Sequence, residues 1–351
     1  MFSNKIIISA DIHWEENKEH IIEYAVEQLL NTIKKTTPLF VILAGDYFNS
    51  RMNADSKTYK KAINYLIEFK KYCKYLIVIK GTHSHDADML DILKEFNKLD
   101  SNILYFDKFT LKEIENIKFA FIPEEYPENF KEYYAPLFQE KVDYIIGHGM
   151  IEGAKLHEGI VNKFIKDLKW NAKRLSENSK YTIFGHVHLP QQLESNVFYV
   201  GSLARFKFGE EHDKGFIIID LNNNELNFNI IDNYEFITFI EKKDEFEFFE
   251  ELVKNEKIYL RYIGEKDSEI LKKFLKITKN PIKFVPQKNK KIEIESNILY
   301  KEIIDKPIEE QYLSIIEEQS KNLTKKKKAL LFKNKENIKK IIREKLNKYQ
   351  Q

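Results

Sequence analysis

Five short apolar runs, each followed closely by a motif rich in His or Asp, constrain the fold of this chain most. The runs 6–8, 41–43, 76–79, 144–146 and 181–184 precede Asp11-Ile12-His13, Gly45-Asp46, Gly81-Thr82-His83-Ser84-His85-Asp86, Gly147-His148 and Gly185-His186-Val187-His188. Apolar runs of this length that end in Gly and a polar residue indicate buried strands of a parallel sheet. Ligands of such sheets gather beyond the carboxyl ends of the strands. We therefore expect the five motifs to meet at one edge of one sheet.

The residue types in these motifs point to bound metal. In Asp11-x-His13 and His186-x-His188 the two outer side chains lie on the same side of an extended chain, so each pair can hold one ion. Carboxylate and imidazole groups that converge are suited to a pair of transition-metal ions, and this mixture favours manganese or iron over a structural zinc. The predicted metal ligands are Asp11, His13, Asp46, His148, His186 and His188.

Composition indicates the compartment. The single cysteine, Cys73, rules out a disulfide within the chain, which fits a reducing environment. The sequence begins with a strand pattern instead of a basic and apolar leader, and no apolar run approaches the ~20 residues of a membrane span. We expect a cytoplasmic protein without a membrane segment.

Patterning divides the chain into three parts. Residues 1–222 alternate strands with amphipathic helical stretches, which is typical of a layered α/β domain. Residues 223–305 indicate a small α+β unit. Residues 306–351 carry an apolar stripe at helical spacing, and within them 321–351 hold 12 Lys and Arg against 2 Glu. Because the whole chain has a net charge of only +2, the rest of it is acidic and needs a local basic patch to bind nucleic acid.

The ordered motifs resemble those of the calcineurin-like metallophosphoesterases. Within that superfamily, Gly185-His-Val-His-Leu-Pro190, Tyr199-Val-Gly-Ser-Leu-Ala-Arg205 and Phe208-Gly209 are similar to SbcD-type nuclease subunits. The resemblance implies a β-sandwich flanked by helices, a capping domain at 223–305 and a helical segment at 306–351 that binds an SbcC-type coiled-coil ATPase. It also implies a manganese-dependent DNA nuclease, a 3′–5′ exonuclease and endonuclease, with two Mn²⁺ ions that Fe²⁺ or Mg²⁺ could replace. We further expect a homodimer.

The resemblance also assigns roles to residues. It makes Asp46 the bridging carboxylate, puts Asp11, His13 and His188 on one ion, and puts His148 and His186 on the other. Arg205 and Lys207 would contact backbone phosphates of the substrate.

The loop at 81–86 departs from the family pattern, which is Gly-Asn-His-Asp or Gly-Asn-His-Glu. Alignment on Gly81 places Thr82 at the ligand position and His83 at the catalytic one. Alignment on Asp86 places Ser84 and His85 there, with a two-residue insertion. We prefer the second alignment, since it restores the His-Asp pair, with His85 acting on the leaving group and Asp86 orienting it. In both alignments a hydroxyl replaces an amide oxygen.

Three functions fit these observations. The first is the DNA nuclease described above. The second is another two-metal phosphoesterase, acting on nucleotides or phosphoproteins. The third is a catalytically weak scaffold subunit, which only the altered 81–86 loop favours.

Overall fold

The computed structural model describes residues 2–157, 160–161 and 170–286. The predicted helical segment at 306–351 lies outside these residues, as does the last part of the predicted capping domain. Residues 1–285 form one compact unit. None of the helices in the described ranges is long and apolar enough to cross a membrane.

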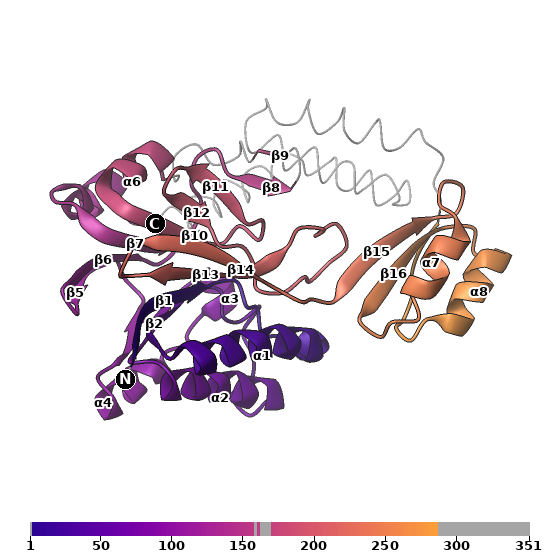
Figure 1. Ribbon diagram of the computed structural model, residues 1–351, viewed down its shortest axis with the longest axis horizontal. Helices are drawn as coiled ribbons and strands as arrows, with labels where there is room; N and C mark the ends of the chain where they lie inside the picture. Colours follow the sequence, from indigo (N-terminus) through magenta and orange to yellow (C-terminus); the bar gives the residue numbers. More distant parts are fainter. Residues whose placement is uncertain (1, 158–159, 162–169, 287–351) are drawn as a thin grey trace, which may run out of the picture. The chain divides into compact units, whose positions relative to one another are not determined.

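Two six-stranded sheets dominate the described chain (Figure 1). The first has the order β14-β13-β1-β2-β3-β4, with bounds Glu225–Ile231, Lys214–Asp220, Ser3–Ser9, Pro38–Ala44, Tyr75–Ile79 and Ile103–Phe106. The second has the order β11-β12-β10-β7-β6-β5, with bounds Gln191–Glu194, Val197–Tyr199, Ser179–Gly185, Val142–His148, Ile117–Ile122 and Thr110–Ile114. Strands β1 to β4 pair in parallel, and so do β6, β7, β10 and β12. Antiparallel strands complete one edge of the first sheet, at β13 and β14, and both edges of the second, at β5 and β11.

The two sheets pack face to face, because alternate residues of their strands point into one shared core. In β1, Ile6 and Ile8 belong to the core between the sheets, whereas Ile7 belongs to the core beneath the helices. The core between the sheets also takes in Phe40, Ile42, Phe119, Ile146 and Ile183. The predicted layered α/β fold is thus confirmed, but the expectation that all five motif-bearing strands share one sheet is wrong. β1, β2 and β3 lie in the first sheet, and β7 and β10 lie in the second.

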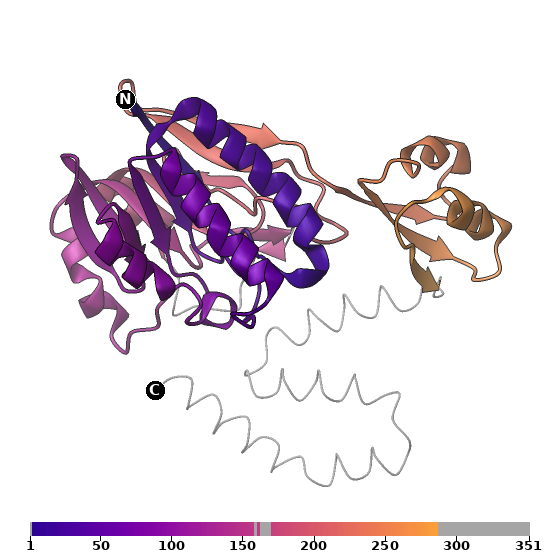
Figure 2. The same cartoon turned by 90° about the horizontal axis from the view of Figure 1, so that it is seen from below.

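Helices cover the outer faces of the sandwich. α1 (Glu19–Thr36) and α2 (Lys57–Lys71) pack side by side on the first sheet (Figure 2). Their apolar residues recur at helical spacing, as in Ile22, Leu29 and Ile33 of α1. The remaining helices are short: α3 (His83–Asp86), α4 (Ile92–Leu99), α5 (Phe130–Tyr133) and α6 (Ala172–Asn178), with 3-10 turns at Glu16–Lys18 and Ala135–Phe138. A two-stranded sheet pairs β8 (Lys155–His157) with β9 (Ile160–Val161).

A small α+β unit follows the sandwich. It contains β15 (Glu235–Ile240), α7 (Phe246–Leu252), β16 (Ile258–Gly264), α8 (Glu269–Ile277) and β17 (Lys283–Pro286). Its sheet has the order β15-β16-β17, and it has its own apolar core, which includes Phe239, Tyr262 and Phe274. The predicted boundary at 222/223 is displaced, because β14 beyond it pairs along its whole length with β13 of the first sheet. The small unit therefore begins at β15.

Candidate metal centre

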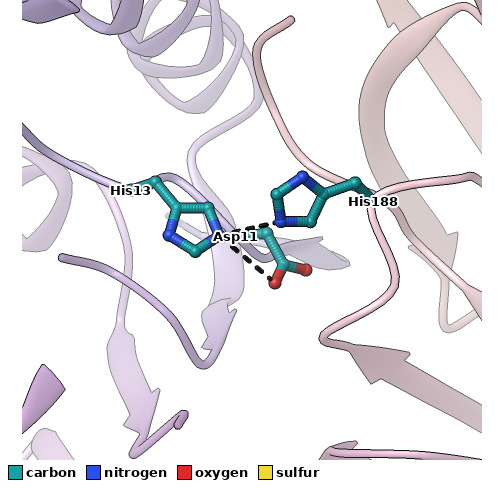
Figure 3. Close-up of side chains that lie close together, drawn as sticks. All are labelled: Asp11, His13 and His188. Atoms are coloured by element: carbon teal, nitrogen blue, oxygen red, sulfur yellow. Dashed lines mark hydrogen bonds and ion pairs between the residues drawn. The ribbon is translucent and has the colours of Figure 1, made fainter. Parts of the chain in front are cut away.

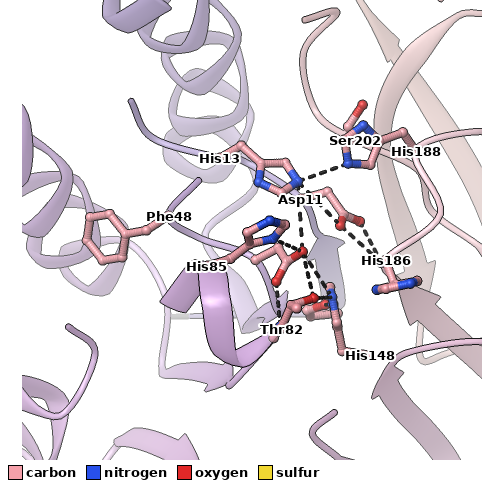
Figure 4. A network of polar contacts seen from close by, with 12 residues as sticks. Asp11, His13, Phe48, Thr82, His85, His148, His186, His188 and Ser202 are labelled. Carbon is pink, nitrogen blue, oxygen red and sulfur yellow. Dashed lines mark hydrogen bonds and ion pairs between the residues drawn. The ribbon is translucent and has the colours of Figure 1, made fainter. Parts of the chain in front are cut away.

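The five motifs follow the carboxyl ends of five strands and meet at one edge of the sandwich. Asp11 and His13 follow β1, Asp46 follows β2, and the 81–86 loop follows β3. His148 ends β7, while His186 and His188 follow β10. Three groups of side chains have ligand atoms close enough to share an ion (Figure 4): Asp11 with His13 and His188, His13 with Asp46 and His85, and Asp46 with His148 and His186.

The first group joins the two sheets (Figure 3). His13 Nε2 lies 2.9 Å from His188 Nε2 and 3.8 Å from Asp11 Oδ1. Two nitrogens bound to one ion at ~2.1 Å each are themselves only a little over 3 Å apart, so this spacing suits a shared cation. Asp11 is fully buried, and both its oxygens accept from the His186 backbone N–H. That contact holds the carboxylate in place between the β1 and β10 loops.

The second group centres on Asp46. His148 Nε2 lies 3.2 Å from Asp46 Oδ2. His148 Nδ1 donates to the Ala44 carbonyl at 2.8 Å, since a carbonyl oxygen can only accept. That hydrogen bond orients the ring so that Nε2 faces the carboxylate, an arrangement typical of metal-binding histidines. Asp46 belongs to two of the three groups, which is the position a bridging carboxylate requires.

The backbone at these residues adopts conformations that side chains normally avoid. Asp11, His13, Asp46 and His186 all have positive φ, at 51°, 54°, 51° and 93°. Each such residue costs of order 1–3 kcal/mol, and such strain gathers at functional sites. Gly45 leaves room for the site, because a Cβ there would lie 2.3 Å from the His148 ring. The fold thus accepts local strain to aim these four side chains at one point.

Burial and charge shift the acid–base properties of the site. Burial raises the pKa of Asp11 and lowers that of His13 well below its usual value. For Asp46, burial by itself would raise the pKa. The charge of His148 and hydrogen bonds from His148 and His85 outweigh burial and hold the pKa of Asp46 far below the usual range. For His148, burial lowers the pKa, and the charge of Asp46 outweighs it and raises the pKa to about 10. Without metal, the Asp46–His148 pair therefore retains a proton that a cation must displace.

The 81–86 loop combines the two alignments considered for it. The Thr82 hydroxyl lies 3.2 Å from Asp46 Oδ2, whereas Ser84 is exposed and makes no hydrogen bond among the described residues. His85 Nδ1 lies 2.7 Å from Asp46 Oδ2, whereas His83 is exposed. The preferred placement of Ser84 as a ligand is therefore corrected in favour of Thr82. α3 is the reason: its single turn points position 85 inward and turns 83 and 84 toward solvent.

Asp86 has a structural position next to the site. Its carboxylate is fully buried and accepts from the backbone N–H groups of Asp46, Phe48 and Gly81 at 3.1, 3.0 and 2.7 Å. These bonds link the β2 and β3 loops. No hydrogen bond between Asp86 and the His85 ring occurs in the described structure, so Asp86 orients the Asp46 loop instead of the histidine.

Two charged residues support His188 from behind. Glu210 Oε1 lies 3.4 Å from His188 Nδ1, and Glu210 Oε2 accepts from the Phe206 N–H. Lys214 is buried and donates to the His188 carbonyl and to Ser202 Oγ, at 2.8 Å each. Lys214 therefore connects the loop that carries His186 and His188 to the segment Gly201-Ser202-Leu203. Neither Glu210 nor Lys214 belongs to one of the five motifs, so their place at the site could not be predicted from the sequence.

Arg205 does not lie free for substrate. Its guanidinium is buried, forms an ion pair with Glu235 and donates to the carbonyls of His212 and Glu211. The predicted phosphate contact by Arg205 is corrected on this ground, because the group is buried and each of its three nitrogens already donates within the protein. Lys207, the other predicted phosphate contact, is exposed.

Glu124 also joins the site and was missed. It follows β6, where the apolar run Phe119-Ala120-Phe121-Ile122 ends in Pro123 and Glu124. All five predicted motifs contain His or Asp, whereas this strand is followed by Pro123 and Glu124, so the motifs did not predict it. Its oxygen lies 3.3 Å from His186 Nδ1.

The donor set fits a pair of divalent cations. It consists of imidazole nitrogens and carboxylate oxygens, without thiolate. Asp11, His13, Asp46 and His148 are buried, and the other three residues of the groups are half-buried. Buried carboxylates and imidazoles at this density are unfavourable unless paired charges or cations compensate them.

Comparison with known proteins gives the class to which this site belongs. The calcineurin-like phosphoesterase family matches residues 4–190, more than half of the 351-residue chain. The chain is 26% identical to "Putative phosphoesterase 244L" of Invertebrate iridescent virus 6, over 63% of this chain and 78% of that protein. It is 22% identical to "Putative phosphoesterase 078R" of Invertebrate iridescent virus 3, over 64% of this chain and 65% of that protein.

Solved structures with a similar course of the chain include a novel archaeal phosphodiesterase and a dimetal phosphatase from Danio rerio. The first is 14% identical, covers 65% of this chain and 99% of its own, and has a TM-score of 0.34. The second is 11% identical, covers 63% and 93%, and has a TM-score of 0.37.

The chain belongs to the calcineurin-like phosphoesterase family, whose members are hydrolases of phosphoester bonds with a dimetal centre. The family expected from the ordered motifs is confirmed, and the candidate ligands lie within or at the end of the matched region.

Proposed function

We propose that this protein is a two-metal phosphodiesterase that cleaves DNA, with Mn²⁺ as its metal. The observation that carries the proposal is the position of Asp46 between two groups of candidate ligands. It groups with His148 and His186, and also with His13, which itself groups with Asp11 and His188. A pair of divalent ions bound by these residues would supply an activated water and neutralise charge on the phosphate. Asp11, His13 and His188 would hold one ion, and His148 and His186 the other.

His85 is the residue placed to move a proton. Its hydrogen bond to Asp46 raises its pKa, although its partial burial acts in the opposite direction. About a third of the side chain is exposed, at 32%, so a substrate can reach the ring. A protonated imidazole at this position can donate to the oxygen that leaves the phosphorus, which is general-acid catalysis.

A basic and aromatic cluster supports DNA as the substrate. Phe208 lies in the loop after β12, within 5.3 Å of the Phe236 ring. The guanidinium of Arg261 and the ammonium of Lys283 lie 5.1 and 5.6 Å from the centre of the Phe208 ring. Aromatic rings flanked by cations suit stacked bases and backbone phosphates of a single strand. With exposed Lys207 nearby in sequence, this cluster supplies a local basic patch on an acidic body.

A cleavage assay with competing substrates tests the proposal. The full chain with Mn²⁺ should cut short DNA duplexes and a phosphodiester chromogen, but not a phosphopeptide. Asp46→Asn should reduce cleavage by at least about a hundredfold, because it removes the shared charge. His85→Ala should reduce turnover by about 10²–10⁴-fold.

His83→Ala is the matched control, since His83 lies in the same helical turn but is exposed. It should keep the cleavage rate of the unaltered chain. Hydrolysis of phosphopeptide or mononucleotide with no action on DNA would instead establish another phosphoesterase, and no hydrolysis of any substrate would establish a scaffold.

The partner of this nuclease remains part of the same proposal. The support is in the sequence of residues 306–351, whose apolar stripe at helical spacing needs a surface to cover it. An SbcC-type coiled-coil ATPase is the partner that the resemblance implies.

A further inference from the structure

Glu124 brings a second carboxylate, beside Asp46, to the second group of candidate ligands. Its Oε2 lies 3.3 Å from His186 Nδ1, 3.9 Å from His148 Nε2 and 2.8 Å from Thr82 Oγ1. The side chain is only 10% exposed. Its other oxygen accepts from the Tyr126 hydroxyl, so Oε2 is the oxygen left to face the histidines. Glu124 is thus held with one oxygen aimed at the site.

The hydrogen bonds around Thr82 cannot all form at once. The hydroxyl has one hydrogen, yet it lies 3.2 Å from Asp46 Oδ2 and 2.8 Å from Glu124 Oε2, both of which only accept when ionised. One of the two contacts therefore places lone pairs against each other. A cation near the three oxygens removes the conflict, because each of them can then face positive charge.

Charge balance favours the same conclusion. The first site has a carboxylate of its own, Asp11, together with two imidazoles. The second has two imidazoles, the shared Asp46 and a neutral hydroxyl, so without Glu124 it would hold a divalent ion with little negative charge. Hard divalent cations such as Mn²⁺ and Mg²⁺ prefer carboxylate oxygen. Glu124 would make the two sites alike, each with its own carboxylate and two histidines around the shared Asp46.

We propose that Glu124 is a ligand of the second metal ion and supplies the strong oxygen donor that Thr82 cannot. This inference rests on the proposed two-metal function. It assigns Thr82 a lesser task, donating its hydroxyl hydrogen to one of the neighbouring carboxylates. It also explains how a chain with a hydroxyl at position 82 can retain two ions.

Mn²⁺ binding to the full chain, freed of metal beforehand, tests the assignment without recourse to activity. Calorimetry and the Mn²⁺ electron paramagnetic resonance signal give the number of ions and their affinities. The unaltered chain should bind two ions. Glu124→Gln should keep the first and bind the second at least about tenfold more weakly, because a charged ligand is replaced by an amide.

Glu125→Gln is the matched control. Glu125 adjoins Glu124 and has the same charge, but its carboxylate accepts from Phe109 N–H at 2.7 Å and from the Tyr133 hydroxyl at 3.0 Å. It should bind two ions with unchanged affinities. If Glu124→Gln does not fold, judged by circular dichroism, Glu124→Asp replaces it: the charge remains, the oxygen is withdrawn by one methylene, and the second ion should weaken selectively.

A rescue variant separates a ligand from a merely structural residue. Thr82→Asn places an amide oxygen, a better neutral donor than a hydroxyl, where the Thr82 side chain now lies. Added to Glu124→Gln, it should recover part of the affinity for the second ion. Two ions with unchanged affinities in Glu124→Gln, or equal weakening of both ions, would overturn the assignment. An unaltered chain that binds no Mn²⁺ would instead overturn the proposed two-metal function itself.

Discussion

Replacement of Lys214 by methionine should destabilise the fold and loosen the candidate metal centre together. The side chain of Lys214 is 1% exposed, and its ammonium group lies 3.8 Å from Glu210 and donates to the His188 carbonyl and Ser202 Oγ. Removal of one partner of a buried ion pair costs about 3–5 kcal/mol, since the other charge stays buried without compensation. The lowered pKa of Lys214 means that burial of its charge already costs roughly 3 kcal/mol at neutral pH. We therefore expect Lys214→Met to lower the free energy of unfolding by roughly 3 kcal/mol in urea denaturation near pH 10.5 without metal, and by much less at pH 7.

The pH dependence of Lys214 provides a second signature. Burial lowers its pKa to about 8, although Glu210 opposes this, whereas the ordinary value is 10.5. Between these values Lys214 binds more protons in the unfolded chain than in the folded one, so its contribution to stability rises with pH in this window. This contribution of Lys214 to the free energy of unfolding is fully present above about pH 10.5 and is lost as the pH falls through about 8. The difference between the pKa of Lys214 in the folded and unfolded chain corresponds to roughly 3 kcal/mol in the free energy of unfolding. Lys214→Met should abolish this slope.

The double variant Lys214→Met/Glu210→Gln controls for the buried charge. It removes both members of the pair, so it should be closer in stability to the unaltered chain than Lys214→Met is. In the double variant the His188 carbonyl would still lack the hydrogen bond from residue 214, so Mn²⁺ should bind about 10-fold more weakly than to the unaltered chain. Equal stability of Lys214→Met and the unaltered chain near pH 10.5, with the same slope above about pH 8, would refute this reasoning.

Two further predictions concern the metal and the helical segment. Mn²⁺ affinity should rise by up to about tenfold per pH unit from pH ~6 to ~9, because binding displaces the proton of His148, whose pKa Asp46 raises to about 10 against the effect of burial. Calorimetry in two buffers of different ionisation enthalpy measures that proton, and an affinity independent of pH contradicts the prediction. Deletion of 308–351 should spare manganese-dependent cleavage of short DNA but abolish binding to an SbcC-type ATPase. A pull-down at high salt without DNA decides this, and equally tight binding by the shortened chain counts against the partner role.

The family and the principal ligand candidates could be predicted because they depend on order along the chain. Each candidate ligand lies two to five residues after an apolar run, and such runs end at the same edge whenever they pair in parallel. The convergence of Asp11, His13, Asp46, His148, His186 and His188 therefore follows from local pattern. It held even though the strands belong to two sheets, because the sheets pack with these edges together.

The sequence could not choose the alignment of the 81–86 loop. Both alignments have a hydroxyl followed by a histidine, and neither anticipated that Thr82 and His85 together would reach Asp46. The choice depends on a single helical turn, which rotates each successive side chain by about 100°. The sequence of the motif alone does not show which of its side chains this rotation directs toward Asp46.

Sequence alone therefore determined the class of the fold, the order of the strands that end in ligands, and most of the residues that could bind metal. The tertiary structure decided which charged residues are free and which are used. Arg205 is occupied by Glu235, Lys214 supports His188, and Glu124 faces His148 and His186, and each of these contacts joins segments well separated in sequence. Such contacts depend on how far one loop reaches toward another across the sandwich, a distance that only packing of the two sheets sets.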